Sequence, residues 1–213
     1  MDRAVTGPLG FRSVIPVSID TVRRALEARS PARLSRPLPH RSSVAIVLRP
    51  VEAGLEALFI QRAERVDDPW SGQVAFPGGR AGPGESSVGT AIRETAEEVG
   101  LDLSTAADLL GGLDEIQAVG RRLALELSIQ PWVFALHGPI GPLRCSDEVA
   151  SAHWLRLSEL FDPARQRPFL YEHEGATIRL PSVHAGALVI WGLTYRMLQS
   201  LAEVVDGGAA GAP

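Results

Sequence analysis

The stretch from Phe76 to Leu101, FPGGRAGPGESSVGTAIRETAEEVGL, constrains the fold more than any other part of the chain. A Pro-Gly-Gly turn at 77–79 stops the short strand pattern QVAF, and glycine and proline dominate the residues that follow. Ser86–Val99 then has the pattern of a helix, and Gly100 stands where a helix commonly ends in a left-handed residue. The sequence therefore predicts a strand, a glycine-rich turn and a helix in direct succession.

Short β-rich runs flank this helix on both sides. SSVAIVLRP (from Ser42) and LEALFIQRA (from Leu55) are joined by the probable turn residues 51–54, which predicts a hairpin. Beyond the helix, LGGLDEI, LALELSIQPWVFAL, EVASAHWLRL and TIRLPSV have the composition of further strands. Ala185–Val205 is typical of a closing amphipathic helix. Strands thus outnumber helices, which predicts an α/β fold with a mixed sheet between helices.

The two ends of the chain differ from its centre. Residues 1–40 are expected to form an arm and linker, with a helix in SIDTVRRALEARS capped by Ser18 or Asp20. The linker SPARLSRPLPH is rich in proline and arginine, and we expect its arginines to be solvated. We expect residues 41–205 to form the main domain and 206–213, DGGAAGAP, to form a flexible tail.

Composition narrows the classes of function. The 213 residues carry a formal net charge of -4, which argues against a nucleic-acid binder and against electrostatic docking on an anionic membrane. The single cysteine, Cys145, excludes an intramolecular disulfide, and the N-terminal residues lack the apolar run of a signal peptide. Polar residues interrupt Ala185–Val205, so it is expected to be a buried helix rather than a membrane span. We expect a cytoplasmic protein, and the apolar face of the last helix could serve a core or a homodimer.

Three carboxylates lie at the end of the central helix where negative charge is disfavoured. Glu94, Glu97 and Glu98 share one face near the C-terminus, so they oppose the helix dipole and repel one another. Glu85 precedes the helix, and Arg93 lies four residues before Glu97, where it can orient that carboxylate. A solvated acidic face is the alternative interpretation. The placement of the charges favours a site for Mg²⁺ or Mn²⁺, because these ions prefer clustered carboxylate oxygens.

The spacing of these residues resembles a Nudix box. Gly79 is followed after five residues by Glu85, and after seven more by the run Arg93–Leu101, RETAEEVGL. Thr95 departs from the pattern, which usually has an aliphatic residue there, but its β-branched side chain can still pack. The resemblance implies an α/β/α sandwich around a mixed sheet. It also implies a pyrophosphohydrolase that uses Mg²⁺ or Mn²⁺ to direct water onto a phosphorus of a small-molecule diphosphate.

The same resemblance implies a set of metal ligands. Glu97 and Glu98 would be the principal ligands, and Glu94 would be a further ligand or the general base. The backbone carbonyl of Gly78 would be another ligand, and Glu85 a supporting or auxiliary metal contact. A cation at this point would turn the repulsion between the carboxylates into coordination.

The roles of other polar residues also follow from the resemblance. Arg93 would hold the carboxylates in place. Relatives sometimes use a glutamate from a later loop as the base, and Glu115 and Glu148 are the candidates for that role. A Nudix module that binds a nucleotide without cleaving it is the alternative from another class of function. Such modules tend to have lost box glutamates, whereas this chain retains them.

Stretches outside the box resemble the coenzyme A pyrophosphatase branch of the superfamily. LFIQRA, GQVAFPGGR, SDEVASAHWLRLSEL and VIWGLTYRML carry this resemblance, which spans most of Ser42–Leu201. It implies hydrolysis of coenzyme A or acyl-coenzyme A to phosphopantetheine and 3′,5′-ADP. Two departures leave ADP-ribose, NADH or dinucleotides as alternatives: Ala63 replaces a serine, and Asp67 and Asp68 stand where a basic residue is expected.

Four residues are candidate substrate contacts. Arg62 can contact a phosphate or form a surface salt bridge, and Arg80 follows the glycine pair of the box. Trp70 can stack on a base or pack beside Pro69. Tyr171, in FLYEHEG, belongs either to a lid over the substrate or to a structural hairpin.

Overall fold

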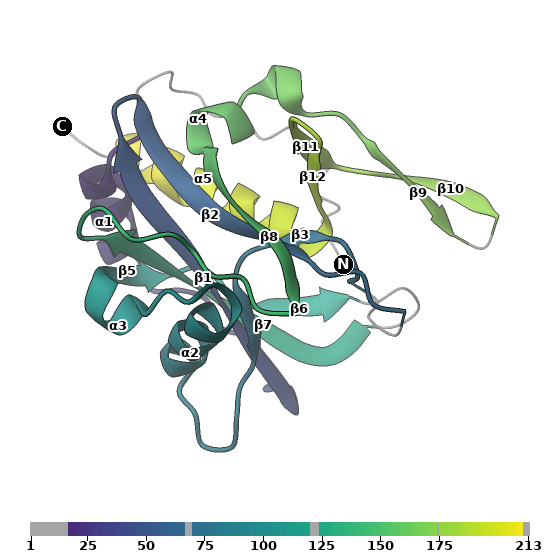
Figure 1. The fold of residues 1–213 in the computed structure, drawn as a ribbon, viewed down its shortest axis with the longest axis horizontal. Helices are drawn as coiled ribbons and strands as arrows, with labels where there is room; N and C mark the ends of the chain where they lie inside the picture. Colours follow the sequence, from purple (N-terminus) through teal and green to yellow (C-terminus); the bar gives the residue numbers. More distant parts are fainter. Residues whose placement is uncertain (1–16, 67–69, 120–123, 174, 211–213) are drawn as a thin grey trace.

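The computed structural model describes residues 17–66, 70–119, 124–173 and 175–210, and its centre is one mixed β-sheet (Figure 1). Eight strands form this sheet, and they are β1 (His40–Val51), β2 (Gly54–Arg62), β3 (Val74–Ala75), β4 (Gly78–Arg80), β5 (Ala107–Gly112), β6 (Ile116–Val119), β7 (Ala124–Leu136) and β8 (Val149–Arg156). The order is β3-β2-β1-β7-β5, with β4 paired to β1, β6 to β7 and β8 to β2. β1 and β7 run parallel and the other pairs are antiparallel, which confirms the mixed sheet.

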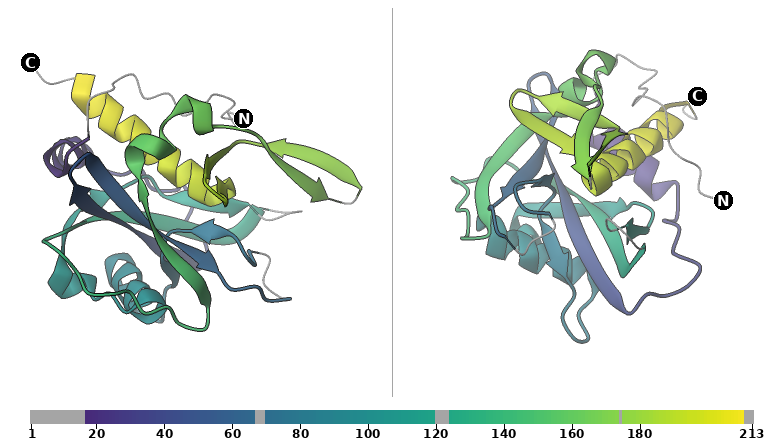
Figure 2. Two further views of the ribbon diagram at one scale, coloured as in Figure 1. Left: turned by 45° about the horizontal axis from the view of Figure 1, so that its top comes forward. Right: turned by 90° about the vertical axis from the view of Figure 1, so that its right-hand side faces the viewer.

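Helices cover both faces of the sheet, and Figure 2 shows the two layers. One face carries α2 (Ser87–Val99) and α3 (Leu103–Ala106), and the other carries α1 (Ile19–Glu27), α4 (Leu157–Leu160) and α5 (Gly192–Ala210). Alternation along β1 supplies both cores: Ala45 and Val47 pack with α2, whereas Ile46 and Leu48 pack with α1 and α5. The predicted α/β/α sandwich is confirmed.

The central helix forms as the sequence predicts. The hydroxyl of Ser86 caps α2 by accepting from the N–H of Gly89 at 3.0 Å. Gly100 ends the helix with φ 69°, a left-handed conformation that favours glycine. Thr95 is buried and its hydroxyl donates to the Ala91 carbonyl at 2.7 Å, so the departure from the box pattern packs without an unpaired polar atom.

The predicted N-terminal helix is present, and it packs on the sheet. Ser18 caps α1, which decides between the two predicted caps. Val22 and Leu26 are buried in the same core as α5. The apolar face of the amphipathic helix α1 is removed from water by packing against this core. Residues 1–16 of the predicted arm lie outside the described residues.

The linker after α1 is held on the sheet, so the prediction of solvated arginines is wrong for Arg33. Arg29, which precedes the linker, forms an ion pair with Asp114. Arg33 donates to the amide oxygen of Gln130 at 2.5 Å. These bonds satisfy polar groups of the sheet that the linker covers.

Two hairpins lie outside the central sheet, β9 (Phe169–His173) with β10 (Ala176–Leu180) and β11 (Ser182–Ala185) with β12 (Leu188–Trp191). The β9–β10 hairpin projects from the body of the molecule (Figure 1), so FLYEHEG belongs to a hairpin. The predicted strand TIRLPSV is divided between β10 and β11 at Pro181. An η1 turn (Pro163–Arg165) joins α4 to this region.

The closing helix differs from the prediction at both ends. Residues 185–191 belong to β11 and β12, because Gly186 (φ 61°) allows a tight turn between two apolar strands. At the other end α5 continues through 206–210, which were predicted to belong to a flexible tail. Adding residues to an existing helix avoids the unfavourable nucleation step, so the helix extends into this segment. Residues 211–213 lie outside the described part of the chain. No helix among the described residues is long and apolar enough to cross a membrane.

Candidate active site

Arg93 gathers three of the predicted carboxylates around one guanidinium. Its Nε and Nη2 donate to the two oxygens of Glu85 at 2.8 Å and 3.1 Å. Nη1 donates to Glu97 at 2.9 Å, and Nη2 lies 2.9 Å from Glu94 Oε1. Nη2 also donates to the backbone carbonyl of Arg80 at 3.0 Å, which ties the helix to β4. The arrangement fixes Glu85, Glu94 and Glu97 relative to one another, because a guanidinium has a rigid planar set of donors.

Glu85 is held at both of its oxygens. Besides Arg93, the N–H of Gly82 donates to Oε2 at 2.8 Å and the Thr90 hydroxyl donates to the same oxygen at 2.9 Å. These bonds, that of Arg93 above all, lower the pKa of Glu85 to about 2. Glu85 is therefore ionised and committed to shaping the loop before α2. The contacts of Gly82 and Thr90 had no signal in the sequence, because they depend on the folded loop.

Glu98 is buried, with 4% of its surface exposed. The N–H of Gly78 donates to its Oε2 at 2.8 Å. Burial raises the pKa of Glu98 to about 7; the hydrogen bond from Gly78 and the charge of Arg62 oppose this rise, and the charges of Glu94 and Glu148 add to it. A carboxylate that repels two others and has one backbone donor is poised to accept a positive partner.

Glu94 packs against the backbone of the glycine pair. A Cβ atom built on Gly79 would lie 2.4 Å from Glu94 Cδ, so a side chain there would occupy the space of the carboxylate. Burial raises the pKa of Glu94, and Arg93 opposes that rise. Gly78 has φ 155°, and its Cβ would lie 2.3 Å from the carbonyl oxygen of Ser43. Gly78 is thus required for the close approach of β4 to β1, whereas Gly79 leaves room for the Glu94 carboxylate.

The carboxylates fit a divalent cation by their chemistry. Within the described ranges, no three His, Cys, Asp or Glu side chains stand close enough together to hold a metal as they are. Glu94 and Glu98 nevertheless offer hard oxygens whose burial as anions is unfavourable, and a cation would relieve that cost. Glu97 uses Oε2 for Arg93 and retains Oε1, whereas both oxygens of Glu85 are engaged. Glu97 and Glu98 would hold the ion, and Glu94 would be a further ligand or the general base; the Gly78 carbonyl stays a prediction.

The two candidates for a base in a later loop differ in their surroundings. Glu115 Oε2 accepts from the backbone N–H of Leu34 at 3.1 Å, so it anchors the N-terminal linker. Glu148 forms an ion pair with Arg65 at 3.0 Å, and its charge acts on Glu98. Of the two, Glu148 is the one that the structure relates electrostatically to the buried carboxylate.

The predicted substrate contacts are not all at the carboxylates. The charge of Arg62 acts on Glu98, so this residue lies beside the site. Trp70 packs against the main hydrophobic core. Tyr171 lies 5.5 Å from Trp191 between ring centroids, in the hairpin on the α5 side of the sheet (Figure 2), and it is not brought to the α2 side.

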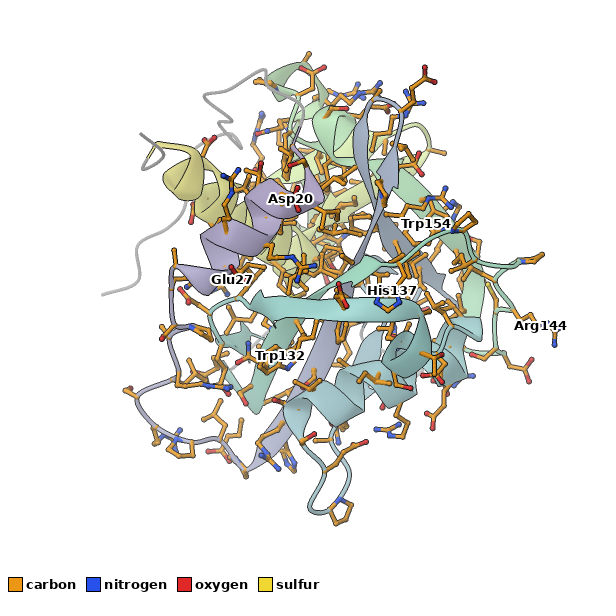
Figure 3. All side chains as sticks on the ribbon, turned by 90° about the vertical axis from the view of Figure 1, so that its left-hand side faces the viewer. Asp20, Glu27, Trp132, His137, Arg144 and Trp154 are labelled. Atoms are coloured by element: carbon orange, nitrogen blue, oxygen red, sulfur yellow. The ribbon has the colours of Figure 1, made fainter. Side chains whose placement is uncertain are left out.

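Two buried polar atoms without a partner were not expected from the sequence. Among the described side chains, Ser43 Oγ and Trp132 Nε1 (Trp132 is labelled in Figure 3) are buried and form no hydrogen bond. Ser43 has the strand parity of Ala45, which packs with α2, and it is paired in register with Gly79. Ser43 therefore adjoins the backbone on which Glu94 rests.

The fold has relatives among known structures. A C. elegans Ap4A hydrolase binary complex superposes with a TM-score of 0.54 at 17% identity, over 81% of this chain and 99% of that one. A MutT/nudix family protein from Enterococcus faecalis gives a TM-score of 0.50 at 18% identity, over 89% of this chain and 70% of that one. At these identities the similarity shows the fold.

Sequence comparison is more specific. An uncharacterized Schizosaccharomyces pombe protein is 37% identical over 150 residues, which are 60% of this chain and 45% of that protein. An uncharacterized Nudix hydrolase, NudL, of Yersinia enterocolitica is 32% identical over 138 residues, 64% of this chain and 67% of NudL. The chain thus spans less than half of the first relative and about two thirds of the second.

The NUDIX domain family matches residues 39–173, a range that begins just before β1 and ends with β9. This range contains all the box residues that Arg93 and Gly78 hold together. At the level of the domain, the match and the relative named as a Nudix hydrolase support a pyrophosphohydrolase enzyme. The chain belongs to the Nudix family.

Proposed function

We propose that this protein hydrolyses the diphosphate linkage of coenzyme A or acyl-coenzyme A, giving phosphopantetheine and 3′,5′-ADP. The observation that carries the reaction type is the carboxylate set itself: Glu94 and Glu97 fixed by Arg93, and Glu98 buried against Gly78. The substrate rests on the stretches outside the box that resemble the coenzyme A pyrophosphatase branch, among them VIWGLTYRML at the start of α5.

The chain's own residues supply binding, orientation and proton transfer. Arg93 holds Glu94 against Gly79, so that its free oxygen keeps one position. Burial raises the pKa of Glu94, which makes it a better base, and it takes the proton of the attacking water. Arg62, whose charge reaches Glu98, contacts a phosphate of the substrate. A divalent cation held by the carboxylates supplies charge neutralisation on the diphosphate and lowers the pKa of the water.

A second group of substrates is favoured by one sequence feature. Ala63 and the acidic pair Asp67-Asp68 replace the serine and the base expected for coenzyme A, which points to ADP-ribose, NADH or dinucleotides. Asp67 and Asp68 lie outside the described residues. A module that binds without cleaving has less support, because the box glutamates are all present and held in place.

A hydrolysis screen tests the proposal. Purified protein is incubated with Mg²⁺ or with Mn²⁺ and with coenzyme A, acetyl-coenzyme A, ADP-ribose, NADH or a diadenosine polyphosphate, and the products are identified by mass spectrometry. Phosphopantetheine with 3′,5′-ADP is the expected result, and preferred cleavage of the other substrates selects the second group. Glu97→Gln and Glu98→Gln should abolish turnover. Glu159→Gln, a half-exposed glutamate paired with Arg165, is the matched control and should retain it.

A further inference from the structure

A pocket of about 290 Å³ lies at the start of the loop that leads into α2. Its walls come from the first residues of β1 and from the loop after β4, and they are residues 39–41 and 80–84. Arg41 and Arg80 are neighbours there because Ser42 is paired with Arg80 and the N–H of Ala81 donates to the Arg41 carbonyl at 2.9 Å. Two segments distant in sequence thus place two arginines around one space.

The charge of this pocket has one sign. His40, Arg41 and Arg80 contribute cationic or basic side chains, and no carboxylate lines the pocket. The described residues provide no ion pair or hydrogen bond for any of these three side chains. The nearby carboxylate of Glu85 adjoins Gly82, and its charge is compensated by the ion pair with Arg93. Arginines that line a pocket without an acidic residue give it a positive potential, which favours a bound anion.

We propose that this pocket binds a phosphate monoester of the substrate. Arginine recognises phosphate through paired N–H donors, and two arginines with an imidazole match a dianion. Gly82 and Gly84 have no side chains, so one wall of the pocket is formed by backbone there, which leaves room for a tetrahedral group. The inference rests on the proposed diphosphate hydrolysis and adds to the substrate a phosphate monoester separate from the diphosphate.

The pocket is close to the carboxylates. Arg93 Nη2 donates to the carbonyl of Arg80 at 3.0 Å and lies 2.9 Å from Glu94 Oε1. One nitrogen atom of Arg93 therefore contacts both the backbone of Arg80, which lines the pocket, and the carboxylate of Glu94. A compound that carries a diphosphate and a separate phosphate monoester can occupy both places. Coenzyme A has such a monoester on its ribose, whereas ADP-ribose and NADH lack one, so this pocket would select between the two substrate groups.

A matched pair of substrates tests the pocket, because coenzyme A and dephospho-coenzyme A differ only by the monoester. The wild type should hydrolyse coenzyme A with the higher kcat/KM. Arg41→Gln and Arg80→Gln should each lower that value about 10- to 100-fold, mainly through KM, the loss expected for a charge-assisted hydrogen bond. Neither change should affect dephospho-coenzyme A. Arg36→Gln, an exposed arginine in the linker, is the control and should affect neither substrate.

The outcomes separate the pocket from the reaction. Equal kcat/KM for both substrates, in the wild type and in both variants, overturns the pocket and leaves the diphosphatase standing. If neither substrate is hydrolysed, the proposed function fails, and the pocket is judged by binding. Metal-free protein is then melted with coenzyme A or with dephospho-coenzyme A. A larger Tm rise with coenzyme A, lost in Arg41→Gln and Arg80→Gln, supports the pocket, and equal shifts overturn it.

Discussion

Replacing Gly79 by alanine should damage the chemistry while leaving the fold nearly as stable. The backbone of Gly79 is outside the left-handed region, so alanine brings no backbone strain. Its Cβ would lie 2.4 Å from Glu94 Cδ and 2.5 Å from both carboxylate oxygens, where ordinary contact begins at 3.4 Å. The carboxylate must therefore move by about 1 Å, a cheap rotation for the end of a flexible side chain that costs about 0.5–1.5 kcal/mol.

The same movement is expensive for catalysis. Glu94 would leave its position 2.9 Å from Arg93 Nη2, and a shift of about 1 Å in a positioned group can reduce turnover about 100-fold. We expect kcat/KM to fall by about that factor, equivalent to about 2.7 kcal/mol in the barrier, while urea unfolding changes by at most about 1.5 kcal/mol. The assays are steady-state hydrolysis with Mg²⁺ and urea denaturation of the metal-free protein.

A matched variant separates this effect from a general effect of added methyl groups. Gly138→Ala introduces a Cβ with no atom within 4 Å and should change neither measurement. Wild-type kcat/KM in Gly79→Ala would show that the position of Glu94 does not matter for turnover. A large loss of stability in Gly79→Ala would show that the carboxylate cannot move aside, and either result would refute the reasoning.

Three further changes probe the same site. Arg93→Lys replaces the planar guanidinium, with its several N–H donors, by a single ammonium group. Urea denaturation should show a free energy of unfolding lower by about 1–3 kcal/mol. The metal-free protein should gain up to about 3 kcal/mol as pH falls from 7 toward 4.5, because Glu98, with pKa about 7 against an ordinary 4.5, is costly only while ionised. A Tm series in pH should show this gain, and Glu98→Gln should remove it. Ser43→Ala removes an unpaired buried hydroxyl, so its Tm should stay equal or rise; a clear fall would show an unrecognised partner.

Local signals in the sequence determined the parts of the structure that were predicted well. Ser86 and Gly100 mark the ends of α2 by cap chemistry that acts within one turn. The spacing of Glu94 and Glu98 on one helix face follows from the helical period alone. Both signals depend on neighbouring residues, so one sequence is enough to read them.

Other features depend on contacts between distant segments. The boundary between β12 and α5 was missed because residues 185–193 are apolar throughout, and such a run does not distinguish a hairpin from a helix. The attachment of Arg33 to Gln130 joins the linker to β7, which no local pattern indicates. For the same reason the sequence could not show that Arg41 and Arg80 share a pocket.

The acidic end of α2 is tolerated by a different means for each carboxylate. Glu97 is 60% exposed at its side chain, so water and Arg93 screen it at small cost. Glu94 is more buried and shares Arg93 with Glu85 and Glu97, so one cation compensates three anions. Glu98 is the most buried, and the backbone N–H of Gly78 donates to its Oε2. The uncompensated charge is therefore concentrated on Glu94 and Glu98. A divalent cation would be stabilised most at that point, and the phosphate that it carries would be held there next to the pocket wall at Arg80.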